Sequence, residues 1–413
     1  MATKNSEREP IYFRSMSLEN VRCFGEKQQI DFVKPDGSIS LWNIIIGENG
    51  VGKTTCLKGL AMATPRFGYD LVDTDYFGRT HSKFPIITYK LSDALDNSHI
   101  VQDDIIFDDQ LWMRRKALIN HLLGYGASRR IGPSSITQEK PDSPVLNLFD
   151  ENTPLMNAEE WLVETDYRAA KSENGDYADR KQKVIYILKK LFRGEVHDFK
   201  IDLETRRPKA KFLTDYGWVN LHDLSLGYKT LIAWMTDFAS RMFDEYPDST
   251  DPLAEPAVIL VDEIDLHLHP QFQRELHSFL TETFPKTQFI VTAHSPLILQ
   301  SAPDANIILL KKEGDHVVVE QNLHEIKNWR IDQILNSDLY GYVGARLPQT
   351  EDKIARRRSL LKKEKLNQSE VSELENLEEE LIDLPVGETP EAIKAMEIIQ
   401  KAAKHYEKQN GKN

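Results

Sequence analysis

The chain has 413 residues, of which 40% are hydrophobic and 28% charged, and its formal net charge is −13. This length is enough for one α/β domain with an insertion, and the negative charge argues against uniform non-specific binding to nucleic acid. The two cysteines exclude a disulfide framework. The polar start and the lack of a long apolar run lead us to expect a cytoplasmic protein outside the membrane.

The first 110 residues contain strand-like runs around one helical stretch. Residues 17–24 and 29–32 have the pattern of a hairpin, and residues 41–46 form a short apolar run typical of a strand buried on both faces. A glycine-rich loop then leads into a helical stretch over residues 53–63. Further strand-like runs lie at residues 84–91 and 100–107.

The glycine-rich loop, Gly47–Thr54, matches the phosphate-binding pattern G-x-x-x-x-G-K-[ST]. Its glycines let backbone N–H groups surround phosphates, and the following helix presents the positive end of its dipole. We predict that Lys53 reaches the β- and γ-phosphates and that Thr54 binds Mg²⁺. The residues that we expect to contact the nucleotide here are Asn49, Gly50, Gly52, Lys53, Thr54 and Thr55.

The middle of the chain has a different pattern. Apolar residues recur at helical spacing over residues 111–126, 158–170 and 179–192, and prolines mark the loops between them. We therefore predict a mostly helical lobe inserted into the domain. Strand-like runs resume at residues 199–203 and 211–213.

A helix begins near Ser225, in a sequence that resembles the ABC signature L-S-x-G-Q. Here it reads Leu-Ser-Leu-Gly-Tyr, with Tyr228 in place of the usual Gln. A Ser hydroxyl and a Gly backbone at a helix N-terminus make a second anion site. We predict that Ser225 and Gly227 bind nucleotide, because this motif stands about 37 residues before a pair of acids.

That pair, Asp262 and Glu263, ends an apolar strand over residues 257–261. Acids at the carboxyl end of such a strand reach the crevice where ligands bind in open α/β sheets. We predict that Asp262 is a magnesium ligand and that Glu263 is the general base that polarises the attacking water. After a helix over residues 271–284, the strand 288–292 delivers His294 to the same edge, and we predict that this catalytic His senses the γ-phosphate.

Four motifs in this order, GENGVGKT, LSLGYKT, VDEIDLHLHP and VTAHSP, resemble the head of SMC/RecF/OLD-type ABC ATPases. The resemblance covers about residues 11–110 and 200–312. It implies an α/β fold, an ABC-ATPase head with a mixed sheet and a P-loop core, with ATP and Mg²⁺ as cofactors. It also implies that Arg22 contacts a nucleotide phosphate and that heads pair head to tail around ATP. Residues 125–129 and 329–335 are similar to stand-alone ATPases encoded beside nucleases in antiphage defence, such as the PtuA subunits of Septu-like systems.

The Q-loop glutamine of the family is missing, and two closely spaced histidines precede Pro270. No Gln lies between Thr54 and residue 84, where the Q-loop ligand of Mg²⁺ is expected, and Asp73, Asp75 and Gln102 all stay open as substitutes. His267 and His269 are too closely spaced, without a third ligand nearby, to favour a metal site. The resemblance instead places their segment at the dimer interface.

The resemblance and the composition together divide the chain into three parts. We predict an ATPase head over residues 1–110 and 200–325, a helical lid lobe over 111–199, and a helical C-terminal extension over 326–413 that binds a partner. The extension has helix-prone stretches at residues 351–366, 368–381 and 390–408. Their narrow apolar stripes could pack on the head or on another chain. Past residue 320 there is no Asp-x-Asp pair of a Toprim nuclease and no HNH-like cluster, so a nuclease must come from another chain.

These observations favour a homodimeric, or higher even oligomeric, ATPase that regulates a separate effector nuclease in antiphage defence. One alternative is a RecF/SMC-like repair ATPase that acts on DNA through the helical lobe. Another is a nucleotide-gated scaffold with negligible turnover. The short basic clusters at residues 114–116, 129–130, 206–211 and 356–358 are either DNA contacts or solvated charged faces.

Overall fold

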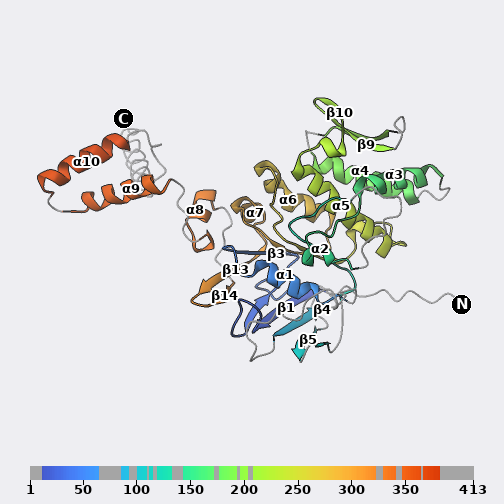
Figure 1. Ribbon diagram of the computed structural model, residues 1–413, viewed down its shortest axis with the longest axis horizontal. Coiled ribbons are helices and arrows are strands. Elements are labelled where there is room, and N and C mark those ends of the chain that lie inside the picture. The colour runs from blue at the N-terminus through green and yellow to red at the C-terminus, as the bar shows by residue number, and fades with distance from the viewer. Residues whose placement is uncertain are drawn as a thin grey trace, which may run out of the picture. The chain divides into compact units, whose positions relative to one another are not determined.

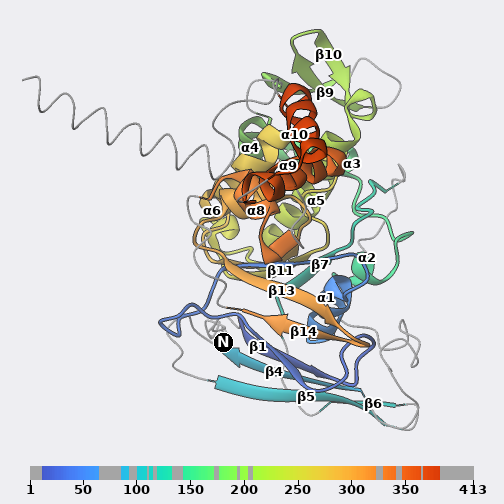
Figure 2. The ribbon, with the colours of Figure 1, turned by 90° about the vertical axis from the view of Figure 1, so that its left-hand side faces the viewer.

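Short apolar runs that are far apart in the sequence lie side by side in a six-stranded sheet (Figures 1 and 2). The order is β14-β13-β3-β12-β11-β7; β14 pairs antiparallel with β13 at one edge, and the other neighbours are parallel. The strands are β3 Trp42–Gly47, β7 Leu122–Tyr125, β11 Ala257–Val261, β12 Thr287–Thr292, β13 Asn306–Glu313 and β14 His316–Glu320. The mixed sheet and the strands at β3, β11 and β12 confirm the predicted α/β class.

The computed structural model divides into two compact units, residues 1–342 and 343–413, which we describe separately. No helix among the described residues is long and apolar enough to cross a membrane. The described residues are 12–64, 85–92, 100–108, 111–114, 119–132, 143–171, 176–192, 196–202, 208–321, 329–340, 347–363 and 366–381.

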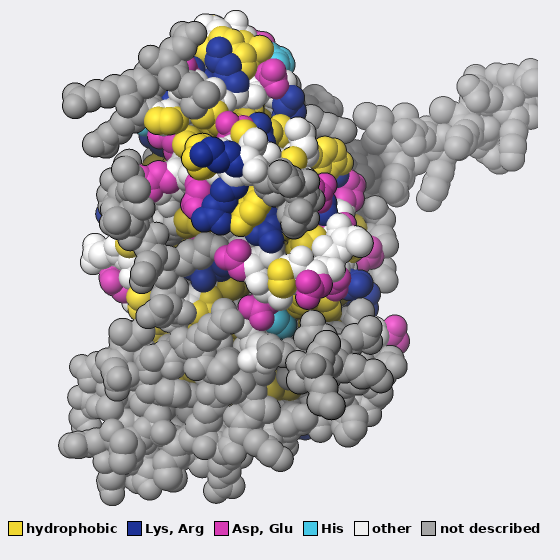
Figure 3. Space-filling model, turned by 90° about the vertical axis from the view of Figure 1, so that its right-hand side faces the viewer, with side chains coloured by type: hydrophobic (Ala, Val, Ile, Leu, Met, Phe, Trp, Pro, Cys, Tyr) yellow, Lys and Arg dark blue, Asp and Glu magenta, His cyan; other side chains and the backbone are white. Residues whose placement is uncertain are grey.

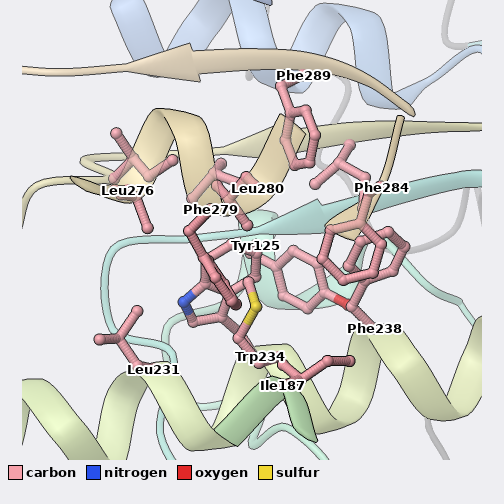
Figure 4. Close-up of a cluster of buried hydrophobic side chains, with 14 of the residues drawn as sticks. Tyr125, Ile187, Leu231, Trp234, Phe238, Leu276, Phe279, Leu280, Phe284 and Phe289 are labelled. Atoms are coloured by element: carbon pink, nitrogen blue, oxygen red, sulfur yellow. The ribbon is translucent and has the colours of Figure 1, made fainter. Parts of the chain in front are cut away.

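Both faces of the six-stranded sheet are covered by apolar cores. Along β3, Ile44 and Ile46 belong to one core, and Ile45 belongs to the other. Because each strand is buried on both faces, its sequence is continuously apolar and does not alternate. On one face, aromatic and aliphatic side chains from β7, β12, α5 (Leu226–Glu245) and α6 (Pro270–Thr283) pack together (Figure 4).

The opposite core surrounds α1 (Lys53–Ala61), which lies between the six-stranded sheet and a five-stranded antiparallel sheet (Figure 2). The second sheet has the order β2-β1-β4-β5-β6. Its strands are β1 Tyr12–Glu19, β2 Gln28–Asp31, β4 Ile86–Ser92, β5 Ile100–Asp108 and β6 Leu111–Arg114. The antiparallel pairing of β1 with β2 confirms that the predicted hairpin exists, but its first strand ends at Glu19, and residues 20–24, predicted as strand, form the turn.

The segment between β7 and β11 holds helices and a small three-stranded sheet. The predicted helices at residues 158–170 and 179–192 are confirmed as α3 (Ala158–Lys171) and α4 (Asp176–Leu191). The sheet order is β10-β9-β8. Its strands are β8 Asp198–Asp202, β9 Lys209–Thr214 and β10 Gly217–Asn220. The remaining short elements of the larger unit are α2 Leu146–Phe149, α7 Pro296–Ser301, α8 Ile331–Leu335 and the 3₁₀ turns Leu221–Asp223, Pro252–Ala254 and Asp338–Tyr340.

The helix predicted over residues 111–126 is wrong. This segment supplies β6 and β7, and β7 pairs in parallel with β11. A four-residue strand that is buried throughout gives an apolar run that periodicity cannot distinguish from part of a helix. Gly124 and Gly126 are the local signal that was missed, since a Cβ on Gly126 would lie 2.5 Å from the carbonyl oxygen of Asn147.

The smaller unit contains α9 (Pro348–Leu361) and α10 (Gln368–Glu380), which confirm two of the three helices predicted for the C-terminal extension. The third, at residues 390–408, lies outside the described residues. Only Leu360 and Leu377 are buried among the described residues of this unit. The three-part division into head, lobe and extension stays a prediction.

Candidate active site

Four neighbouring parallel strands, β3, β12, β11 and β7, end at one edge of the six-stranded sheet. The loop Gly47–Gly52 follows β3, Asp262 and Glu263 follow β11, and His294 follows β12. In an open α/β sheet this carboxyl edge is the place where ligands bind. The structure therefore brings three of the predicted motifs to adjacent positions.

The backbone of the loop after β3 depends on glycine at two points. A Cβ on Gly47 would lie 2.4 Å from the Leu310 carbonyl oxygen, so only a glycine lets β13 approach this closely. Gly52, with φ of 90°, is the N-cap residue of α1, and no side chain caps this helix. The N-terminal N–H groups of α1 thus face the loop without a side-chain acceptor, which suits a phosphate.

The ammonium group of Lys53 lies inside this loop. Its Nζ donates hydrogen bonds to the carbonyl oxygens of Gly47 (2.8 Å) and Glu48 (2.9 Å). Burial lowers the pKa of Lys53, and the nearby carboxylates of Asp262, Glu263 and Asp265 oppose this shift. Of the other predicted loop contacts, Asn49 and Gly50 are exposed and Thr55 is buried.

Asp262 joins the loop to the end of β11. Its Oδ2 accepts a hydrogen bond from Thr54 Oγ1 (2.7 Å), and its Oδ1 accepts one from Thr292 Oγ1 (2.6 Å). The predicted magnesium ligands, Thr54 and Asp262, are thus in direct contact. A hydroxyl and a carboxylate are the hard oxygen ligands that Mg²⁺ takes when it also binds phosphates, so the residues present fit a nucleotide with Mg²⁺. Thr292 was missed by the sequence analysis, because a Thr at the end of a β-strand is unremarkable.

Glu263 begins the turn after β11 in a left-handed backbone conformation, with φ of 49°. Such a conformation costs a non-glycine residue about 1–3 kcal/mol and persists only where the surroundings hold it. The Glu263 N–H donates to Thr292 Oγ1 (2.7 Å), so one threonine hydroxyl contacts both acids of the pair. The Glu263 side chain is partly exposed, which leaves it accessible to water.

Arg129, on the segment that follows β7, is buried beneath the same turn. Its Nη1 donates to the Asp262 carbonyl oxygen, and its Nη2 donates to the Glu263 carbonyl oxygen at 2.9 Å. Burial lowers the pKa of Arg129 to about 10, opposed by the carboxylates of Asp262, Glu263 and Asp265, so the guanidinium is charged at neutral pH. Sequence reasoning places Arg129 in the basic cluster 129–130 as either a DNA contact or part of a solvated charged face. Its burial contradicts both interpretations for Arg129, whereas Arg130 is exposed.

Asp265 positions the segment that contains His294. Its Oδ2 accepts hydrogen bonds from the backbone N–H groups of His294 (3.0 Å) and Ser295 (2.7 Å). The His294 side chain is exposed at the edge of the sheet, where the sequence analysis placed it.

The turn that contains Arg22 lies beside the phosphate-binding loop. Cys23 Sγ donates to the Val51 carbonyl oxygen (3.4 Å), and a Cβ on Gly52 would lie 2.4 Å from that sulfur. Arg22 itself is exposed, with φ of 46°. Its backbone is therefore next to the loop, as the predicted phosphate contact requires.

The predicted signature motif lies at the N-terminus of α5. Ser225 is the exposed N-cap residue, and its side chain accepts from the Tyr228 N–H. Gly227 is packed so closely against the turn after β11 that a Cβ would lie 2.2 Å from the His267 carbonyl oxygen. Leu226 is 56% exposed, which is high for a leucine at the start of a buried helix.

The candidates for the missing Q-loop ligand and the two histidines before α6 lie in different places. Asp73 and Asp75 lie outside the described residues, and Gln102 lies in β5 opposite Lys90. His269 is the N-cap residue of α6 and accepts from the Gln271 N–H, so it has a structural role. Among the described residues, no group of three or more His, Cys, Asp or Glu side chains could hold a metal ion.

Comparison with known proteins agrees with this geometry. A family described as "AAA domain, putative AbiEii toxin, Type IV TA system" matches residues 43–300. The chain is 27% identical over 423 residues to "Septu protein PtuA" of Bacillus mycoides (strain KBAB4), covering 97% of this chain and 56% of that protein. It is 32% identical over 178 residues to "Retron Vc95 probable ATPase" of Vibrio cholerae serotype O1 biovar El Tor, covering 43% of this chain and 34% of that one. The chain thus spans little more than half the length of the first relative and about a third of the second.

A solved structure shows the same fold. It is the SMC head in the "Crystal structure of the SmcHead bound to the C-winged helix domain of ScpA". The match has a TM-score of 0.51 and 16% identity, and it covers 75% of this chain and 97% of the head. Together these similarities confirm the resemblance to SMC-type ABC ATPases and to PtuA that the sequence motifs predict.

Proposed function

This chain belongs to the family described as "AAA domain, putative AbiEii toxin, Type IV TA system", and on that premise we propose that it hydrolyses ATP with paired ABC-type heads and regulates an effector in antiphage defence. The observation that carries the proposal is the hydrogen bond between Thr54 and Asp262 (2.7 Å). It joins the phosphate-binding loop to the acid pair, so a triphosphate on the loop lies close to Glu263. Such placement of a water-activating carboxylate beside the phosphates is what hydrolysis requires.

In the proposed reaction each group has a separate task. The loop backbone, the α1 N-terminus and Lys53 bind the phosphates, with Asn49, Gly50, Gly52 and Thr55 in supporting contacts. Thr54 and Asp262 would hold Mg²⁺, which neutralises phosphate charge when bound. Glu263 takes the proton of the attacking water, His294 senses the γ-phosphate, and Arg22 contacts a phosphate of the nucleotide.

The test of hydrolysis is Glu263→Gln, which removes the proton acceptor and keeps the shape of the side chain. We expect ATP binding to persist and turnover to fall about 10²–10⁴-fold, the usual range for loss of a general base. Glu275→Gln, an exposed acid on α6, is the matched control and should leave turnover unchanged. Turnover by Glu263→Gln at the wild-type rate would show that Glu263 is not the base.

The proposed pairing of heads is supported by the exposure of Ser225 and Leu226 at the start of α5. In this arrangement each nucleotide contacts the loop of one protomer and Ser225 of its partner. We expect Ser225→Arg and Lys53→Ala chains to be inactive separately and to recover activity when mixed, because a mixed dimer keeps one intact site. A mixture that stays inactive at every ratio contradicts the shared site.

The proposed effector is a nuclease encoded in another chain, and the unit 343–413 is its proposed docking region. Support comes from the similarity to a Septu protein and a retron ATPase and from the few buried residues of α9 and α10. We expect the full chain to co-purify with a nuclease encoded beside it. Deletion of residues 343–413 should abolish that capture and leave ATP hydrolysis intact. A truncated chain that still captures the nuclease contradicts the assignment.

Action on DNA is the second candidate. One observation favours it: the β8–β10 sheet exposes Tyr216 (96%), and Lys200 lies over the ring of Trp218, 4.4 Å from its centroid. Aromatic and basic groups together can bind single strands. On the face shown in Figure 3, however, Lys and Arg side chains lie among Asp and Glu side chains. Salt-dependent binding to a single-stranded oligonucleotide that is lost in Trp218→Ala would favour this candidate.

A further inference from the structure

Arg129 is a buried cation that binds backbone and makes no ion pair with a carboxylate among the contacts of the described residues. It is 2% exposed. Nη1 donates to the carbonyl oxygens of Gly126 (3.2 Å) and Asp262, and Nη2 donates to that of Glu263 (2.9 Å). The guanidinium therefore bridges two consecutive carbonyl groups of the turn that carries the acid pair.

The turn needs such a support because of its backbone conformation. Glu263 has φ of 49°, so its peptide groups are held in a sparsely populated arrangement. Its N–H is fixed by Thr292 Oγ1 (2.7 Å), and its carbonyl oxygen also accepts from the Leu266 N–H (3.0 Å). Arg129 fixes the carbonyl groups on both sides of the Glu263 N–H. The direction in which the Glu263 side chain leaves the backbone is thus determined by Thr292 and Arg129 together.

The segment that carries Arg129 is itself anchored. The Gly126 N–H donates to Asn147 Oδ1 (2.8 Å), and Asn147 Nδ2 donates to the Thr153 carbonyl oxygen (2.7 Å). The Tyr125 carbonyl oxygen accepts from the Asp262 N–H (2.8 Å), so the end of β7 is in register with the end of β11. Arg129 therefore reaches the turn from a fixed position.

We propose that Arg129 is a positioning residue for hydrolysis, which acts by holding the backbone of Asp262 and Glu263 so that the Glu263 carboxylate faces the attacking water. The proposal rests on the proposed function, since it assigns Glu263 as the base. The chemistry explains the residue type: a planar guanidinium presents parallel donors to two acceptors, whereas a lysine ammonium is a compact charge without that fork.

The experiment compares Arg129→Met, Arg129→Lys and the neighbouring exposed control Arg130→Met in the full chain. We expect Arg129→Met to lower kcat about 10²-fold, the scale of a small misplacement of a reacting group. The KM and the binding of a fluorescent ATP analogue should stay within about threefold of wild type, because only the transition-state arrangement is lost. Arg129→Lys should recover part of kcat, and Arg130→Met should match the wild-type protein.

Two further measurements separate positioning from a general structural role. In the Glu263→Gln background, Arg129→Met should reduce single-turnover hydrolysis by less than about threefold, since both changes remove the same contribution. Added guanidinium should raise the kcat of Arg129→Ala and leave Arg130→Ala unchanged.

Three outcomes overturn the proposal: a wild-type kcat in Arg129→Met, ATP binding that weakens as much as kcat, or losses that multiply in the double variant. If Arg129→Met does not fold, Arg129→Lys decides, and a wild-type kcat there overturns the proposal. Failure of the proposed function is recognised separately, by normal turnover in Glu263→Gln.

Discussion

The carboxyl edge of the six-stranded sheet and the α9–α10 unit both rely on charged side chains, but they use them in different ways. At the edge, Asp262 and Arg129 are buried; the Asp262 carboxylate accepts from two hydroxyls, and the two Nη atoms of Arg129 donate to backbone carbonyl oxygens. In the smaller unit, Arg356 and Glu373 form an exposed two-point ion pair between the helices. A buried polar group costs free energy when its partner is lost, whereas an exposed charge regains water. Charged side chains thus fix the geometry of the edge, and they contribute little to the stability of the α9–α10 unit.

The largest effect on stability should come from Thr292→Val, which replaces the shared hydroxyl by a methyl group. The Asp262 Oδ1 loses a partner in a buried place, and the Glu263 N–H loses one in a partly buried place. We expect the free energy of unfolding of the larger unit to fall by roughly 2–6 kcal/mol, the sum of two losses of about 1–3 kcal/mol each. Urea denaturation measures it, with Thr292→Ser as the control that keeps the hydroxyl. A Val variant as stable as the wild-type protein would mean that the edge tolerates unpaired polar groups, as the α9–α10 unit does.

A smaller loss is expected for Gly227→Ala, which tests the packing of α5 against the turn after β11. The new Cβ would lie 2.2 Å from the His267 carbonyl oxygen, so one backbone must move. Overpacking of this kind costs about 1–3 kcal/mol. Gly59→Ala on α1 is the matched control, because its Cβ would meet only ordinary contacts at 3.5 Å or more. Unchanged urea midpoints for both variants would contradict the close approach.

A change of about 0.5–1.5 kcal/mol, the contribution of one hydrogen bond, is expected for Tyr125→Phe. The Tyr125 hydroxyl donates to Asp237 Oδ2 (2.9 Å), which also accepts from Arg241 Nε (2.8 Å). Arg241 stays paired with Asp237 Oδ2 in the variant, so the loss is limited to one bond. Denaturation that shows a loss as large as that of Thr292→Val would indicate that Asp237 depends on the hydroxyl.

The smallest effect on stability is expected for Arg356→Ala on α9. Its side chain is 50% exposed, so water can replace the lost partner. We expect hydrogen exchange in α9 and α10 to be almost unchanged, at low and at high salt. A marked rise in exchange would show that the ion pairs, and not Leu360 and Leu377, hold these helices together.

The sequence predicts those residues of the site that belong to a motif or directly follow a buried strand. Lys53, Thr54, Asp262 and Glu263 were found because a glycine-rich loop and an apolar strand end at them. Thr292 and Arg129 were not found, since their role depends on the pairing of β12 and β7 with β11, which no local pattern specifies. The same non-local pairing explains why residues 122–125 were predicted as helix: their burial on both faces exists only once β11 lies beside them.

The order of the strands at the edge also has a consequence for biosynthesis. The phosphate-binding loop ends at Thr54, but the strand that completes the edge ends at Thr292, about 240 residues later. At roughly 5–20 residues per second, the ribosome makes the loop about 12–48 s before its partners emerge. Until then β3 lacks both of its neighbours in the sheet, β12 and β13, and the nascent chain exposes an apolar strand that is prone to aggregate. The edge that forms the candidate site is therefore complete only late in synthesis, after β12 has emerged.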